Sequence, residues 1–142
     1  MKNEIYKLML LFIAGGIVYA AMEVAYREFT HFSMFITGGL CFVIIGSLRY
    51  IRVRGREIPV TLRMLIGAGV ITVLELICGL IVNVWLGLNV WDYSGEPYNL
   101  MGQICLATSS VWLFLSFVAV YLDVFLRWGM FREKSDKMRM LP

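Results

Sequence analysis

Four long runs of apolar residues dominate the sequence, at residues 5–26, 33–51, 60–88 and 100–127. A helix needs about 20 mostly apolar residues to cross the hydrocarbon core of a bilayer. Continuous apolar runs are typical of such helices, whereas the strands of a membrane barrel alternate apolar and polar residues. The sequence therefore predicts an all-α integral membrane protein with four transmembrane helices. They form one polytopic membrane domain over residues 1–142, which ends in a basic tail at 128–142.

The composition agrees with this architecture. Hydrophobic residues make up 60% of the chain and charged residues 16%, whereas soluble domains average about 45–50% and about 25%. The net charge is +3, but the basic residues stand in short groups between apolar runs rather than in one patch. We therefore expect no nucleic-acid partner. The expected surroundings are the lipid bilayer of the cell membrane, which the chain crosses several times.

The basic residues are distributed unevenly between the two ends of the predicted helices. Of the 13 Lys and Arg residues, Arg27 alone falls on one side and all the others fall on the opposite side. Basic residues are retained on the cytoplasmic side of membrane proteins. The sequence therefore predicts that both termini are cytoplasmic, together with the turn at residues 52–59. The basic tail also fits a segment that lies on the anionic inner leaflet, although a solvated tail explains it equally well.

Two parts of the chain resemble each other. Residues 15–23 and 67–75 each begin with Gly and end with Glu inside an apolar run, and residues 38–41 resemble residues 102–105. Such a duplication predicts two parallel repeats of two helices, an arrangement found in some transporters. It requires the first helix to be retained. The alternative is a cleavable signal peptide, with Lys2 and Lys7 before the apolar run and Val18-Tyr19-Ala20 as the cleavage site.

Acidic residues inside the apolar runs are the strongest candidates for a substrate or ion-binding site. Glu75 lies about 18 Å beyond Arg63 at 1.5 Å per residue, and Glu23 about 24 Å beyond Lys7. These distances place Glu75 near the midplane of the bilayer and Glu23 nearer the outer side. A charge at the bilayer centre costs about 2.5–3.5 kcal/mol and must face protein or water. Asn83 shares the helix face of Glu75, and Tyr19 shares that of Glu23. These four residues predict a site for a substrate, cation or proton, and the alternative is a structural pair of buried carboxyls.

The connection before the fourth run contains three aromatic residues, two acids and no base. Trp and Tyr favour the interface between membrane and water, so an interfacial turn is one interpretation. The other is an outer lid over a cavity that opens outward, whose acids attract cations. We assign this lid to Trp91, Asp92, Tyr93 and Asn99.

Motifs of known chemistry are absent from the sequence. It contains no nucleotide-binding loop, no serine-hydrolase elbow and no zinc-protease motif. Its three cysteines are widely spaced within apolar runs and form no zinc pattern. We therefore expect no catalytic residues, no metal and no cofactor, and we expect that the protein is not an enzyme.

A longer pattern resembles a known family. It consists of Glu75 in apolar surroundings, then Trp91-Asp92-Tyr93-Ser94, then the segment from Pro97 through Asn99 and Gly102 to Cys105, and Trp112. This pattern resembles the bacterial family described as putative ABC-transporter type IV permeases, and also the vertebrate transmembrane protein 229 family. The resemblance implies four or more membrane helices and a role in transport. It also implies a separate ATPase, which would touch the loop between Arg49 and Arg63.

Two functions follow. The first is a membrane transport protein or permease subunit with an intramembrane carboxylate site. Because four helices do not easily enclose a path, this function requires a homo-oligomer or a hetero-complex, and glycines such as Gly15, Gly16, Gly38, Gly39, Gly67, Gly69 and Gly79 are expected at helix contacts. The alternative is a non-transporting membrane scaffold or sensor subunit whose buried carboxyls are structural.

The charge asymmetry generates a topology prediction. A single cysteine placed at Ser94 is expected to react in intact cells with an impermeant thiol reagent added outside, and one placed at Ser135 is expected to react only after the cells are opened. The parent chain, labelled in parallel, gives the background. If the cysteine at position 135 reacted in intact cells and the cysteine at position 94 did not, the orientation would be the reverse of the predicted one.

Overall fold

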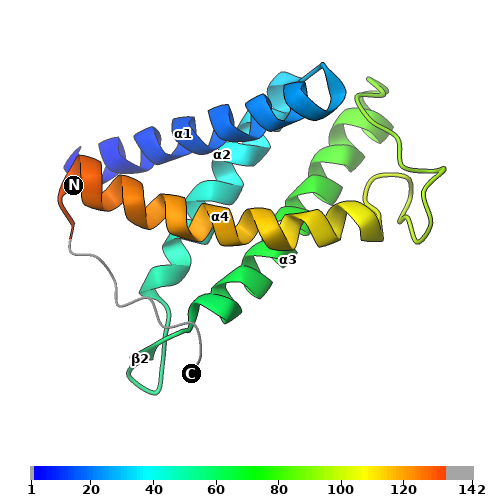
Figure 1. Ribbon diagram of the computed structural model, residues 1–142. Coiled ribbons are helices and arrows are strands. Elements are labelled where there is room, and N and C mark those ends of the chain that lie inside the picture. The colour runs from blue at the N-terminus through cyan, green and yellow to red at the C-terminus, as the bar shows by residue number, and fades with distance from the viewer. Residues whose placement is uncertain (1, 134–142) are drawn as a thin grey trace.

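The computed structural model describes residues 2–133 and is built almost wholly of helices. Its elements are α1 (Lys2–Arg27), α2 (Phe32–Ser47), the 3-10 turn η1 (Leu48–Tyr50), β1 (Arg52–Val53), β2 (Arg56–Glu57), α3 (Val60–Gly79), the π-helical turn η2 (Leu80–Trp85) and α4 (Leu106–Phe131). Four helical stretches of 24, 19, 26 and 26 residues are long and apolar enough to cross a membrane. The predicted helical architecture is therefore confirmed (Figure 1). Residues 134–142 of the expected basic tail lie outside the described residues.

The helix ends differ from those expected, most of all in α4. This helix begins at Leu106 rather than near residue 100, because Met101 and Gly102 have φ angles of 53° and 68°. Residues with such angles cannot continue a right-handed helix. The helix continues beyond Arg127 to Phe131 and ends where Arg132 adopts a φ of 53°. Earlier in the chain, α2 ends at Ser47 rather than at residue 51, and the helical residues after Pro59 end at Trp85 rather than at 88.

The basic connection after α2 forms a small antiparallel hairpin. β1 pairs with β2 so that Arg52 lies opposite Glu57 and Val53 opposite Arg56. Between the strands, Arg54 and Gly55 have φ angles of 53° and 75°. Two central residues with positive φ are typical of a type I′ turn, whose twist matches that of the flanking strands. The hairpin is exposed, so its arginines lie on the surface between the end of α2 and the start of α3.

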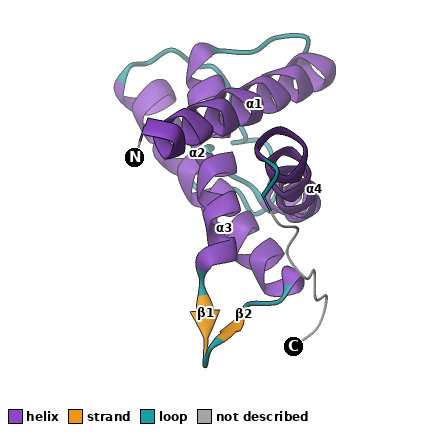
Figure 2. Ribbon diagram, turned by 90° about the vertical axis from the view of Figure 1, so that its left-hand side faces the viewer, coloured by secondary structure: helices purple, strands orange, loops and turns teal. Residues whose placement is uncertain are grey.

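The helices associate as two pairs. α1 packs mainly on α2 and α3 mainly on α4, while α2 also contacts α3 and α4 (Figure 2). Glycines allow this close approach, since a Cβ at Gly39 would lie 2.7 Å from the backbone oxygen of Phe12. The other glycines expected at helix contacts are similarly enclosed, namely Gly15, Gly16, Gly38, Gly67 and Gly79. Gly69 is the exception, because a Cβ there would meet open space.

α1 and α4 form a wedge. At the end of the molecule that carries both termini of the described chain, Lys7 of α1 forms an ion pair of 2.9 Å with Glu133, just after α4. From there the two helices diverge, and the connection between η2 and α4 lies at the opposite end of the molecule, where it leads into α4 (Figure 1). This wedge creates the space in which the candidate site lies.

The proposed internal repeat is only partly compatible with the observed elements. Residues 15–23 and 67–75 occupy comparable positions within α1 and α3. Residues 38–41, however, lie inside α2, whereas residues 102–105 precede α4. The second half of the sequence alignment therefore pairs a helix with a loop, because the left-handed residues Met101 and Gly102 prevent an earlier start of α4. The duplication of the first helix of each pair stays a prediction.

The glycine contacts generate a stability prediction with an internal control. Gly39→Ala is expected to destabilise the protein by about 1–3 kcal/mol, because the added methyl overpacks the contact with Phe12. Gly69→Ala places the same methyl in open space and is expected to be neutral or to stabilise α3 by up to about 1 kcal/mol. Melting temperatures in one detergent measure both. Equal melting temperatures for the two variants would contradict the packing of α1 on α2.

Candidate intramembrane site

Glu75 is the most completely enclosed acidic residue of the predicted site. It lies on α3, and 1% of its surface is exposed. One carboxyl oxygen accepts a hydrogen bond of 2.7 Å from the indole N–H of Trp112 on α4. The other accepts one of 3.3 Å from the hydroxyl of Tyr93, which belongs to the connection before α4. Both oxygens therefore have partners, which removes much of the cost of burying the group.

Tyr93 is suited to this role. It lies outside the membrane-spanning helices, and partial burial together with the nearby Glu75 carboxyl raises the pKa of its phenol. The hydroxyl therefore stays protonated at neutral pH and donates its hydrogen to Glu75. The same contact fixes the connection before α4 to the last turns of α3.

Tyr19 lies next to this cluster on α1. Its ring stacks on that of Trp112, with 5.7 Å between ring centroids and an interplanar angle of 28°. The close approach requires Gly38 of α2, where a side chain would collide with the tyrosine. Tyr19 is 8% exposed, and within residues 2–133 its buried hydroxyl oxygen has no hydrogen-bond partner.

Glu23 lies one turn beyond Tyr19 on α1. Its Oε1 pairs with Arg27, at the i,i+4 spacing that favours ion pairs on a helix. Its Oε2 is buried and has no hydrogen-bond partner among the described residues. About 10% of the side chain is exposed. The site therefore contains two buried oxygen atoms, on Tyr19 and Glu23, whose hydrogen-bonding capacity is unused within the described part of the chain.

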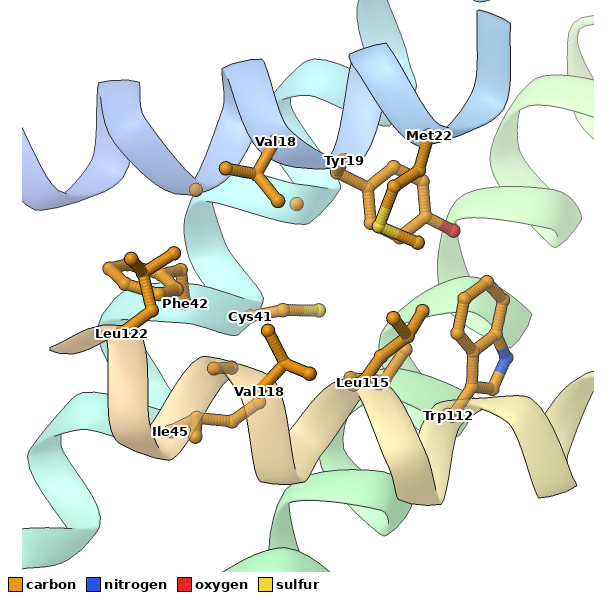
Figure 3. A pocket seen from close by; sticks show the side chains of 14 residues that line it. Val18, Tyr19, Met22, Cys41, Phe42, Ile45, Trp112, Leu115, Val118 and Leu122 are labelled. Atoms are coloured by element: carbon orange, nitrogen blue, oxygen red, sulfur yellow. The ribbon is translucent and has the colours of Figure 1, made fainter. Parts of the chain in front are cut away.

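A cavity of about 180 Å³ lies between the diverging ends of α1 and α4. Its walls combine aromatic rings with an ion pair, and its lining residues are Tyr19, Met22, Glu23, Tyr26, Arg27, Tyr93, Thr108, Val111 and Trp112. A second, apolar cleft of about 60 Å³ continues between the same two helices and shares Tyr19, Met22 and Trp112 with the first. Figure 3 shows Tyr19 and Met22 of α1 facing Trp112 and Leu115 of α4 across this cleft.

The residues predicted as an outer lid form a closely bonded loop. The indole N–H of Trp91 donates to the backbone oxygen of Gln103 at 2.9 Å. Asp92 accepts a bond of 2.8 Å from the backbone N–H of Ser94, and hydrogen bonds from Ser94 hold the pKa of Asp92 below its usual range. The side-chain amide of Asn99 donates to the backbone oxygens of Ser94 and Glu96, and its oxygen accepts from the N–H of Gly102.

Asn83 lies on the same buried face as Glu75, two turns further along the chain in η2. Glu75, Gly79 and Asn83 follow one another at four-residue spacing and are all buried. Asn83 donates to Gln103 at 2.9 Å and accepts from the backbone N–H of Val90 at 2.7 Å. It is not among the residues that line the cavity next to Glu23. Its side chain therefore holds the outer loop, and the cavity gathers Tyr19, Glu23 and Tyr93.

An ion pair between Asp123 and Arg127 lies at the opposite end of the molecule. The two side chains are 2.9 Å apart, and both are almost completely buried. Arg49, after α2, approaches Asp123 at 3.8 Å, and Arg127 donates to the hydroxyl of Tyr50 at 3.1 Å. The pair therefore also joins α4 to the end of α2, a role that the i,i+4 spacing alone does not predict.

Several contacts escaped the sequence interpretation. One of them, the ion pair between Glu23 and Arg27, could have been predicted, because opposite charges four residues apart on a helix favour pairing. The bond between Glu75 and Trp112 joins residues 37 positions apart, and no local pattern indicates it. Gln103 accepts a hydrogen bond from Asn83 and donates one to the backbone oxygen of Met101. These contacts depend on a loop in a segment for which the sequence predicts a helix.

Large apolar side chains cover the outside of the molecule, among them Leu65, Val73, Phe114 and Phe125, each at least half exposed. Contiguous apolar surface of this kind requires lipid or another protein as a partner. Together with the four membrane-crossing helices and an interior polar site, it defines a multi-pass membrane protein. Within residues 2–133, no group of three His, Cys, Asp or Glu side chains is placed to hold a metal ion.

The family follows from a comparison with known proteins. A family model described as "Putative ABC-transporter type IV" matches residues 10–139. The match covers nearly the whole chain, so the protein belongs to this family. No curated protein and no solved structure matches the chain. The resemblance to the transmembrane protein 229 family stays a prediction.

The bonding of the outer loop generates a test of its rigidity. Asn99→Ala removes three hydrogen bonds of about 1 kcal/mol each and is expected to speed amide exchange at Gly102 and its loop neighbours at least tenfold. Hydrogen–deuterium exchange with mass spectrometry measures this. Ser110→Ala is the matched control, because Ser110 bonds only to the backbone of α4. Unchanged exchange in Asn99→Ala would contradict the observed loop.

Proposed function

We propose that this protein is the membrane-spanning component of a transport system and that its cargo enters the cavity between α1 and α4. The observation that carries the proposal is a pair of buried oxygens, on Tyr19 and Glu23, that have no hydrogen-bond partner within residues 2–133 and lie near the enclosed carboxyl of Glu75. Polar groups buried at membrane depth are expensive and mark substrate or ion pathways. Membership of the family described as "Putative ABC-transporter type IV" supports transport as the activity.

In this proposal the site residues have different roles. Glu23 and Tyr19 present oxygen atoms to the cargo. Glu75 supplies a second acidic group behind the aromatic wall, which Trp112 and Tyr93 connect to the cavity. Asn83 holds the outer loop. Trp91, Asp92, Tyr93 and Asn99 form the lid, which is rigid because its bonds are internal to the loop or reach α3.

Transport by this chain requires an assembly. α1 has few contacts with α4, and four helices do not easily enclose a path, so a closed path needs a second copy or another membrane subunit. A separate ATPase is the expected energy source. Its proposed contact is the exposed β1–β2 hairpin, whose arginines lie on the proposed cytoplasmic side together with both termini. The proposed location is the cell membrane.

A second candidate function is a non-transporting scaffold or sensor subunit. The observation that favours it is the complete bonding of Glu75, since a carboxyl with two good donors is also what a structural residue requires. In that case the Glu75 cluster holds α3, α4 and the outer loop together, and no cargo is needed to explain it.

Substitutions of Glu75 separate the two functions. The protein is purified from its native membrane with any partner it retains and reconstituted into vesicles. Uptake of protons, rubidium, sodium and methylammonium is then measured, with ATP supplied inside or outside. For transport, Glu75→Gln is expected to lower uptake at least tenfold while the melting temperature stays within a few degrees, because glutamine keeps hydrogen-bonding oxygen and nitrogen atoms in place.

Glu75→Leu is expected to lower both uptake and stability, the latter by about 1–3 kcal/mol, because Trp112 and Tyr93 lose their acceptor. Glu96→Gln, which removes an exposed acid of the outer loop, is the control. Full uptake by Glu75→Gln, with unchanged pH dependence, would refute the functional role of Glu75. If none of the four ions is taken up above the level of protein-free vesicles, the scaffold function is preferred.

A further inference from the structure

We propose that the cavity and the apolar cleft together form one binding site for an alkylammonium ion, with its ammonium group at Glu23 and Tyr19 and its alkyl chain between α1 and α4. This assignment rests on the proposed function, because it names the class of cargo for the same site.

The unpartnered oxygen atoms of the cavity favour a ligand that donates hydrogen bonds. Glu23 and Arg27 form an ion pair on its wall, and the pair leaves one carboxyl oxygen of Glu23 without a partner within residues 2–133. The hydroxyl oxygen of Tyr19 is similarly unpartnered. An ammonium group has three hydrogen-bond donors and no acceptor. It can therefore satisfy both oxygens, whereas an anion would add a further acceptor.

The aromatic lining favours an organic cation over a metal ion. Rings of Tyr19, Tyr26, Tyr93 and Trp112 surround the cavity. Hard cations such as calcium and magnesium require about six or more oxygen ligands, and the lining offers few. Ammonium groups, in contrast, are attracted to the faces of tryptophan and tyrosine rings. The free carboxyl oxygen of Glu23, whose other oxygen is paired with Arg27, and the aromatic rings are together suited to an amine in its protonated form.

The apolar cleft indicates that this amine carries a hydrocarbon chain. The cleft shares Tyr19, Met22 and Trp112 with the polar cavity, so the two spaces meet. It continues along α4 from Trp112 to Leu122 (Figure 3), which corresponds to about 15 Å at 1.5 Å per residue. Its remaining lining is almost wholly apolar, with residues such as Val18, Leu115 and Val118. An alkyl chain is the substituent that such walls accept.

The orientation of the site in a membrane agrees with this occupant. Glu23 and Arg27 stand at the end of α1, where the helix leaves the apolar run, and the cleft runs from there into the membrane-spanning part of the wedge. An alkylammonium ion placed in this way has its charge near one surface and its chain at hydrocarbon depth. It could enter sideways from the lipid, because α1 and α4 diverge toward this end.

Isothermal titration of the purified full chain with methyl-, propyl- and hexylammonium chloride tests the proposal. Affinity is expected to rise about fourfold per buried methylene. Hexanol and hexanoate, which lack the positive charge, are expected to bind at least tenfold more weakly than hexylammonium. Tyr19→Phe is expected to weaken all three amines about tenfold and to leave folding unchanged, since the lost hydroxyl has no partner in the described chain.

Val118→Phe tests the cleft separately. It fills the apolar space and is expected to abolish the gain from methyl- to hexylammonium while methylammonium binding is retained. Val73→Phe is the matched control, because Val73 is more than half exposed and lines neither space. Glu23→Gln is expected to lower the affinity for every amine at least tenfold, whereas Glu96→Gln leaves it unchanged.

Several outcomes would overturn the proposal. They are the absence of saturable amine binding, equal affinity for hexanol and hexylammonium, or equal competition by sodium chloride at the same concentration. The result is independent of the transport assay. Amine binding with full uptake in Glu75→Gln would leave this site standing and refute the proposed role of Glu75 in transport. Glu75-dependent uptake without amine binding would refute the alkylammonium site alone.

Discussion

The enclosure of the Glu75 carboxyl is the constraint on which the rest of the structure depends. A carboxyl at hydrocarbon depth requires hydrogen-bond donors from the protein, because lipid offers none. Trp112 and Tyr93 supply them from α4 and from the loop before it. α3, α4 and the outer loop must therefore meet at one point. The bonds from Trp91 to Gln103 and from Asn83 to Gln103 extend the same junction outward by one layer.

At the opposite end of the molecule, several ion pairs hold the helices together. Asp123 reaches α2 because Gly46 leaves room for it, and Arg49 and Arg127 surround it. Partial burial raises the pKa of Glu133. The hydrogen bond from Lys7 and the charges of the nearby arginines lower it by a larger amount, so the pKa lies below its usual value. Its contribution is therefore complete above the ordinary carboxyl pKa and is lost as the pH falls through the lowered value. At neutral pH, α1 and α4 remain joined at this end and diverge at the other.

The sequence predicts the four helices well, but it predicts only part of the contacts in the candidate site. Long apolar runs indicate membrane-spanning helices directly, so the four helices followed from length and composition. The depth of Glu75 and Glu23 in the bilayer stays a prediction. The start of α4 did not follow from the sequence, because Met101 and Gly102 take left-handed angles that only the hydrogen bonds of the folded loop explain. The aromatic loop was recognised from its composition. Its attachment to Glu75 depends on a contact between residues 18 positions apart, and such a contact has no periodic pattern.

Glu23 and Glu75, which occupy equivalent positions in the two similar sequence segments, differ in their hydrogen bonding. Glu75 has a donor for each oxygen and is fixed between α3 and α4. Glu23 shares one oxygen with Arg27 and leaves the other unpartnered within residues 2–133, on the helix with the fewest contacts to α4. A ligand that bonds to Glu23 and Tyr19 while packing against Trp112 would touch α1 and α4 together. Its binding would then be linked to the separation of these helices, and by reciprocity a partner that draws them together would raise its affinity. In the proposed site, the polar residue that would respond to a ligand is therefore Glu23, while Glu75 forms a fixed wall of the site.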